Sequence, residues 1–130
     1  MPQKQGNSSS SGGRVDGSLG TVIAAANVAI GAGWATEGAF AITTGSNDQR
    51  GQIVVTCGAT SPSQATATVT LTFVDGAFNS APFTIVTTTN DNSIDTGHAT
   101  WATTTTAMVL THSLLPVSTK IYKFTYLNVA

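Results

Sequence analysis

Residues 65–73 read Ala65-Thr-Ala-Thr-Val-Thr-Leu-Thr-Phe73, with an apolar residue at every odd position and threonine at every even one. Successive side chains of a β-strand point to opposite faces, so this pattern predicts one apolar face and one hydroxyl-bearing face. Helical spacing would mix both kinds of side chain around the helix. We therefore expect a strand of an antiparallel sheet whose threonines are the more exposed side chains. Its expected core residues are Ala65, Ala67, Val69, Leu71 and Phe73.

Other segments show similar strand patterns, separated by turn signals such as Asp75-Gly76, Pro62 and Pro116. The further expected strands are residues 39–44, 51–57, 82–89, 97–103, 107–112 and 119–129. Residues 19–30 are ambiguous, because their β-branched residues suit a strand while three consecutive alanines suit a helix. About eight short strands with a turn every 8 to 12 residues predict an all-β, antiparallel β-sandwich or jelly-roll-like fold.

The last of these segments is long and two-sided. Tyr122, Phe124 and Tyr126 share one face, while Ile121, Leu127 and Val129 share the other. A partial repeat is also visible, because residues 40–48 and 83–91 share the pattern Phe-x-Ile-x-Thr-x-x-Asn-Asp. Two readings remain open for this similarity: a true repeat with equivalent places in paired sheets, or chance in a composition that uses few residue types.

Composition sets limits on the partners. Only 8% of the 130 residues are charged, against roughly 25% in an average soluble domain, and the formal net charge is −1. Threonine is the commonest residue. A chain so poor in basic residues is not built to attract nucleic acid or an anionic membrane. We expect neither as a partner.

Cys57 is the sole cysteine, so the chain cannot form an intrachain disulfide or a cysteine-based zinc site. Its alternation with Ile53 and Val55 predicts a buried, unreactive thiol. No segment has the apolar run that would span a bilayer, and the first residues do not form a signal peptide. We expect the protein to be made in a cytoplasm and to stay there, or to leave inside something assembled there.

The first 18 residues carry almost no apolar side chain and include four consecutive serines followed by two glycines. Such a composition is typical of a flexible chain. We therefore divide the protein into an N-terminal polar arm, residues 1–18, and a β-sandwich domain, residues 19–130. Lys4 and Arg14 lie in this arm, where we expect them to contact acidic groups of a partner.

Several stretches resemble a module found in bacteriophage structural proteins. They are Arg50-Gly-Gln-Ile-Val-Val-Thr-Cys-Gly-Ala-Thr-Ser-Pro62, the threonine alternation to Phe73, Ala81-Pro-Phe-Thr-Ile-Val86, Trp101-Ala-Thr-Thr-Thr-Thr-Ala107 and Tyr122-Lys-Phe-Thr-Tyr126. About residues 46–129 resemble domains of tail-fibre, head-fibre and other virion proteins. The resemblance implies an exposed, oligomeric virion component, with a homotrimer as the expected state, and it supplies no catalytic residues.

Two functions follow from the resemblance. One is a virion building block, either a capsid decoration (cement) protein or a short head fibre, attached through the N-terminal arm to other virion proteins such as the major capsid protein. The alternative is the receptor-binding tip of a tail fibre that recognises a host surface glycan. A single domain without a fibre shaft favours the decoration protein.

The search for chemistry yields only weak candidates. Asp91 and Asp95 lie close together in a polar turn, where they suit a solvated turn better than a carboxylate pair for glycoside cleavage or a Ca²⁺ site. His98 and His112 would need a third ligand to hold zinc. We therefore expect no enzyme, no cofactor and no metal.

Trp34 and Trp101 are the two tryptophans. Each suits a core position or an interface anchor better than a sugar-stacking platform, because aromatic side chains dominate cores and interfaces. Together with Lys4 and Arg14, they are the residues expected to contact partners or other subunits.

Overall fold

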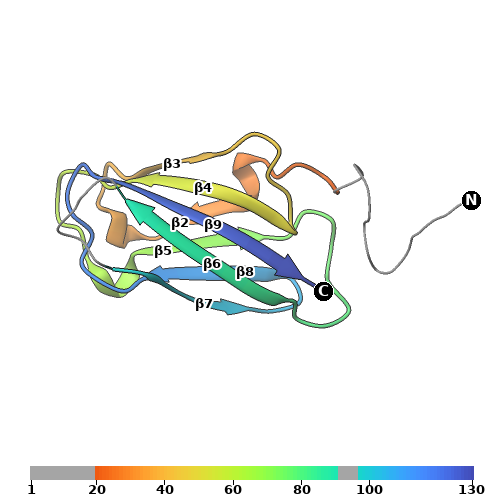
Figure 1. Cartoon of the computed structure of the whole chain (residues 1–130). Coiled ribbons are helices and arrows are strands. Elements are labelled where there is room, and N and C mark those ends of the chain that lie inside the picture. The colour runs from red at the N-terminus through yellow and green to blue at the C-terminus, as the bar shows by residue number, and fades with distance from the viewer. Residues whose placement is uncertain (1–19, 91–96) are drawn as a thin grey trace, which may run out of the picture.

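Two antiparallel sheets of four strands face each other in the computed structural model, which describes residues 20–90 and 97–130 (Figure 1). The rear sheet in this view has the order β2 (Val28–Ile30), β5 (Thr68–Thr72), β8 (Ala107–His112) and β7 (Ala99–Thr103). The front sheet has the order β3 (Ala39–Ile42), β4 (Arg50–Thr56), β9 (Ile121–Val129) and β6 (Phe83–Asn90). Among the described residues, the 3₁₀ turn η1 (Ala25–Asn27) precedes β2, while η2 (Ala32–Trp34) and η3 (Gln64–Thr66) lie on connections between the two sheets. The predicted antiparallel β-sandwich is confirmed.

Strand β5 is the threonine-alternating segment, and it lies between β2 and β8. Val69, Leu71 and Phe73 are buried, whereas the threonines between them are partly or fully exposed, as predicted. The prediction was wrong for Ala65, which is exposed in η3. The chain makes a 3₁₀ turn there and becomes a strand only at Thr68, so the strict alternation of the sequence begins before the strand does.

The core is centred on Trp34, which is fully buried between the two sheets. Its ring centroid lies 5.2 Å from that of Tyr122 and 5.8 Å from that of Phe124, both on β9. The ring of His112 on β8 has its centroid 6.0 Å from that of Trp34. The indole Nε1 donates a hydrogen bond to the Thr68 carbonyl at 2.9 Å, so this large side chain is satisfied as well as packed.

The segment that was ambiguous in sequence, residues 19–30, contains one 3₁₀ turn and the short strand β2. Within its described residues, 20–30, the alanines do not form a helix longer than this turn. Its path is set by the close approach of Gly31 and Gly33 to the backbone around η3. A Cβ atom on Gly33 would lie 2.2 Å from the backbone nitrogen of Ala67, and one on Gly31 would lie 2.2 Å from the carbonyl oxygen of Thr66. Glycine is needed at both positions because no side chain fits.

Buried polar side chains tie the turn between β3 and β4 to distant strands. The Asp48 carboxylate accepts hydrogen bonds from the backbone N–H groups of Val74 and Asp75 at 2.9 and 2.8 Å. Asn128 donates from Nδ2 to the Asp48 carbonyl at 2.8 Å and accepts from the Thr84 hydroxyl at 2.6 Å. These contacts join the segment after β5 and strand β9 to one turn, and Asn128 links the turn to β6.

The two copies of the partial repeat do not occupy equivalent environments. They begin in β3 and β6, which are the opposite edges of one sheet. Phe40 and Ile42 pack partly buried against the core, whereas Phe83 and Ile85 are exposed. Asp91 lies outside the described residues. The shared pattern therefore corresponds to opposite orientations of the two strands.

Candidate interaction surface

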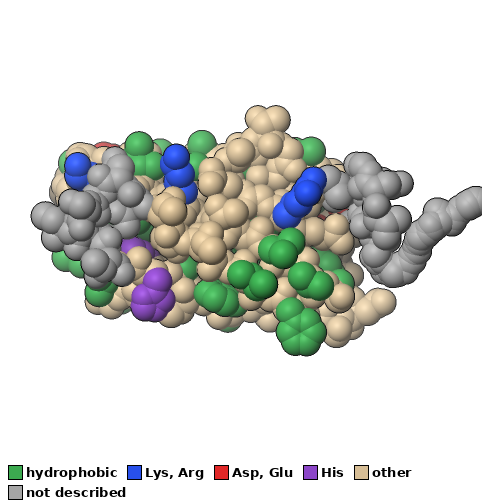
Figure 2. Space-filling view, in the orientation of Figure 1, with side chains coloured by type: hydrophobic (Ala, Val, Ile, Leu, Met, Phe, Trp, Pro, Cys, Tyr) green, Lys and Arg blue, Asp and Glu red, His purple; other side chains and the backbone are tan. Residues whose placement is uncertain are grey.

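Four large apolar side chains are exposed together on the outer face of the front sheet. Phe83 is 82% and Ile85 59% exposed on β6, and Leu127 is 43% and Val129 48% exposed on β9. Phe83 lies directly opposite Val129 across the two strands, and Ile85 opposite Leu127. We call this set the apolar strip. Figure 2 shows hydrophobic side chains gathered over β6 and β9 beside a basic group.

The strip faces solvent because of the register between β6 and β9. On β9 the residues Tyr122, Phe124 and Tyr126 turn into the core, so Leu127 and Val129 must point outward. Their partners on β6 lie on the same face, which leaves Thr84, Val86 and Thr88 to face inward, partly buried. The hydroxyl of the inward-facing Thr84 forms a hydrogen bond with the hydroxyl of Thr103 on β7 at 2.7 Å.

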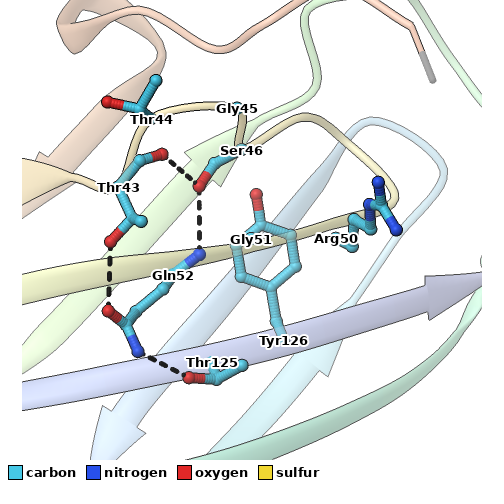
Figure 3. Close-up of a pocket in the computed structure, with 9 residues that line it drawn as sticks. All are labelled: Thr43, Thr44, Gly45, Ser46, Arg50, Gly51, Gln52, Thr125 and Tyr126. Atoms are coloured by element: carbon cyan, nitrogen blue, oxygen red, sulfur yellow. Dashed lines mark hydrogen bonds between the residues drawn. The ribbon is translucent and has the colours of Figure 1, made fainter. Parts of the chain in front are cut away.

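A shallow depression of about 450 Å³ adjoins the strip on the same sheet (Figure 3). Its lining residues are Thr43, Thr44, Gly45, Ser46, Arg50, Gly51, Gln52, Thr125 and Tyr126. The Gln52 amide links Thr43 to Thr125 across the depression. Its Oε1 accepts a hydrogen bond from the Thr43 hydroxyl at 3.0 Å, and its Nε2 donates one to the Thr125 hydroxyl at 3.0 Å. The exposed Arg50 lies opposite Leu127 in the register of β4 and β9, so the depression is the polar border of the strip.

Two buried groups near this sheet have perturbed acidity. Burial, with the negative charge of Asp48 as a smaller cause, raises the pKa of Tyr126 well above its usual value. The Tyr126 hydroxyl donates to the Asn47 carbonyl, which holds the phenol inside the sheet. Burial also raises the pKa of the Cys57 thiol, which is 1% exposed. The thiol is therefore protonated and enclosed, as expected for a structural cysteine.

The residues predicted to contact partners are not brought together. Trp34 lies in the centre of the core and has no exposed surface. Trp101 lies on the edge strand β7 and is 43% exposed. Lys4 and Arg14 lie outside the described residues. Sequence reasoning did not identify the apolar strip, although residues 82–89 were predicted as a strand, since alternation alone does not say which set of side chains faces the core.

The two histidines considered as possible zinc ligands lie in different environments. His112 is buried beside Tyr122, with ring centroids 4.8 Å apart, while His98 is exposed and contacts Ser113. In residues 20–90 and 97–130, no three side chains of His, Cys, Asp or Glu gather in a way that would hold a metal ion. Asp91 and Asp95 lie outside this part of the chain. None of the described helices has the length and apolar character to cross a membrane.

Comparisons of the chain with family models, with curated proteins and with solved structures found no match.

Proposed function

We propose that this chain is a non-enzymatic structural protein on the exterior of a bacteriophage particle, of the capsid decoration (cement) or short head-fibre type. The observation that carries the proposal is the apolar strip, because a phenylalanine 82% exposed beside three further exposed apolar side chains is typical of a protein contact surface. The resemblance of residues 46–129 to virion modules supplies the particle as the setting.

The arrangement of the surface supports a protein partner. An apolar centre bordered by polar groups is the usual anatomy of a protein interface, and the strip with its polar depression has this form. The rigid, hydrogen-bonded sheet beneath it holds the side chains in place, so little conformational entropy is lost on binding. In this proposal the N-terminal arm attaches the protein to the capsid and the sandwich contacts other copies.

The test is to purify bacteriophage particles from cells that produce this chain, disassemble the particles and measure the copy number of the chain by mass. Hundreds of copies identify a decoration protein, and a dozen or so identify a fibre. Absence from purified particles would overturn the proposal. A paired measurement compares Phe83→Ser, which removes the most exposed apolar side chain, with Thr125→Ser on the same sheet face. Incorporation should fall for the first variant and stay unchanged for the second.

The polar depression favours a second candidate, the glycan-recognising tip of a tail fibre. Its hydroxyl and amide groups are preorganised by the Gln52 bridge, and Arg50 offers a cation beside them. Groups of this kind bind sugar hydroxyls and carboxylates. Titration with neutral and acidic oligosaccharides would test it, with Gln52→Ala expected to abolish any binding that the unmodified protein shows. An absence of binding at millimolar sugar would remove this candidate.

A further inference from the structure

The geometry of the β6–β9 ladder shows which backbone groups of β6 face away from the sheet. The backbone N–H of Asn128 donates to the Gln49 carbonyl at 2.7 Å, on the β4 side of β9. In an antiparallel ladder the residues before and after it direct their backbone groups to the other neighbour, which here is β6. Leu127 and Val129 therefore pair with Ile85 and Phe83 through backbone hydrogen bonds.

The intervening residues of β6, Thr84, Val86 and Thr88, consequently direct their N–H and C=O groups to the open edge. Within the described residues, no backbone partner occupies these groups on the edge side. The contacts of β6 with β7 run through side chains: the two hydroxyls of Thr84 and Thr103, and the Ala99 N–H with the Thr88 hydroxyl. Among the residues that the structure describes, the backbone groups of this edge are therefore open to another strand.

Strand β6 also lacks the features that normally protect an edge. Natural sheets cover or blunt their edges with charged residues, prolines, bulges or very short strands. β6 has eight residues, Phe-Thr-Ile-Val-Thr-Thr-Thr-Asn, with no charge and no proline among them. The other edge strands are shorter, with three residues in β2, four in β3 and five in β7.

We propose that β6 pairs with β6 of a second copy of this chain, antiparallel, about a two-fold axis that passes beside Ile85. The two front sheets then form one continuous sheet of eight strands. A second copy fits because the strand that must be added is itself uncharged and apolar on the same face, and β6 provides this to its partner. A two-fold contact uses the same surface on both copies, so each edge satisfies the other.

The position of the axis follows from the side chains. With the axis beside Ile85, Thr84 lies opposite Val86 of the other copy, and the two residues exchange both backbone hydrogen bonds. Ile85 then lies opposite the same residue of the second copy in a non-hydrogen-bonded pair, where side chains are closest, and Phe83 reaches it diagonally. An axis beside Thr87 would instead set threonines opposite each other and separate the apolar side chains.

Trp101 lies on β7, the edge strand of the rear sheet that contacts β6, so its fluorescence can report the pairing. The hydrogen bonds between Thr84 and Thr103, and between Ala99 and Thr88, flank it on β7 at 2.7 and 3.1 Å. It is 43% exposed, whereas Trp34 has no exposed surface. Pairing of two β6 edges brings a second sandwich next to Trp101, so its fluorescence should shift to the blue as the protein concentration rises.

This inference deepens the proposed function and rests on it only in treating the apolar strip as a protein contact. A two-fold pair replaces the trimer that the resemblance implies. The solution experiments below test the pairing in purified protein, whereas the particle measurement tests the virion role. Failure of one therefore does not imply failure of the other.

The first experiment introduces single cysteines. Ile85→Cys should form an intermolecular disulfide under mild oxidation, because opposed non-hydrogen-bonded residues lie about 4.5 Å apart between Cα atoms, within disulfide reach. Thr87→Cys should not, since its two copies would be offset along the strands. Ala41→Cys, exposed on the opposite edge strand β3, is the matched control, and the buried Cys57 stays unreacted in all three. Cross-linking by Thr87→Cys alone, or equally by all three variants, would overturn the proposal.

The second experiment measures association by sedimentation at micromolar concentration. The unmodified chain should form a dimer. Ile85→Lys should raise its dissociation constant at least about tenfold, because it sets two like charges opposite each other. Ala41→Lys should leave the dimer intact. Ile85 is 59% exposed, so the variant should keep the far-UV spectrum of the folded protein. A monomeric unmodified chain, or a trimer unaffected by Ile85→Lys, would contradict the inference.

Discussion

Leu71 is completely buried in the middle of β5, in register with Val28 on one side and Met108 on the other. Removing its side chain leaves a cavity that the flanking strands cannot close. We expect Leu71→Ala to lower the free energy of unfolding by about 2–5 kcal/mol. Equilibrium denaturation measures this directly. Thr72→Ala, on the exposed side of the next position, should change stability little, and equal effects of the two variants would contradict the assignment of faces.

Tyr126 predicts how stability depends on alkaline pH. Its pKa is raised in the folded protein above the ordinary value of 10.0, so the fold favours the protonated phenol. Below pH 10 the phenol is protonated in both the folded and the unfolded chain, so Tyr126 makes its full contribution to the free energy of unfolding. Above this pH, the unfolded chain loses the proton first, and stability should fall by about 1.4 kcal/mol per pH unit.

Urea denaturation between pH 8 and 11.5 provides the measurement for Tyr126. Tyr126→Phe removes the hydrogen bond to the Asn47 carbonyl, so it should be less stable at pH 8 by about 1 kcal/mol. The difference between the two proteins should then shrink as the pH rises above 10. If the two free energies of unfolding differ by the same amount up to pH 11.5, the pKa of Tyr126 does not change on unfolding.

At the scale of the elements, the Asp48 carboxylate connects the β3–β4 turn to the end of β5. Asp48→Ala leaves the N–H groups of Val74 and Asp75 without their acceptor and should cost about 1–3 kcal/mol. Amide hydrogen exchange should accelerate at these two positions before it changes in the centre of β5. Thr44→Ala, exposed in the same turn, serves as the control, and uniform acceleration throughout β5 would contradict this local role.

The strands and the turns between them could be predicted because alternation and turn residues are local properties of the sequence. The strict threonine pattern identified the buried face of β5. The pattern also separated the two faces of β9, but it did not say which of them is buried. Alternation does not show which face of a strand is buried when the side chains of either face could belong to the core. In β6, Phe83 and Ile85 look like core residues, yet the register with β9 turns them outward and buries threonines. A shift of one residue would reverse the faces, and only the partner strand decides.

At the scale of the whole molecule, residues 1–18 should be dispensable for folding and necessary for attachment to particles. They contribute almost no apolar side chain, so their removal takes little from the core. Ordering such a segment costs about 1–2 kcal/mol of backbone entropy per residue, so attachment would require many partner contacts. Deletion of residues 2–18 should leave the melting temperature unchanged and abolish binding to particles that lack the protein.

Two results of the deletion would contradict this prediction. If the shortened protein unfolds, the arm belongs to the core and the predicted boundary at residue 18 is wrong. If it binds particles as well as the full chain, attachment runs through the sandwich. Double substitution of Lys4 and Arg14 by glutamine is the finer test, and should weaken binding by no more than about 1 kcal/mol per exposed ion pair.

Strand β9 is the last strand in the chain, yet it lies between β4 and β6 and carries Tyr122, Phe124 and Tyr126 into the core. During synthesis, the front sheet therefore has no centre until residues 121–129 have left the ribosome. Until then β4 and β6 lack their shared neighbour, and Trp34 lacks the aromatic side chains of β9 that pack against it. The nascent chain should depend on chaperones at this stage, and a ribosome stalled before residue 121 should hold a protease-sensitive chain. The emergence of residues 121–129, rather than any earlier event, therefore sets the moment at which the front sheet can close.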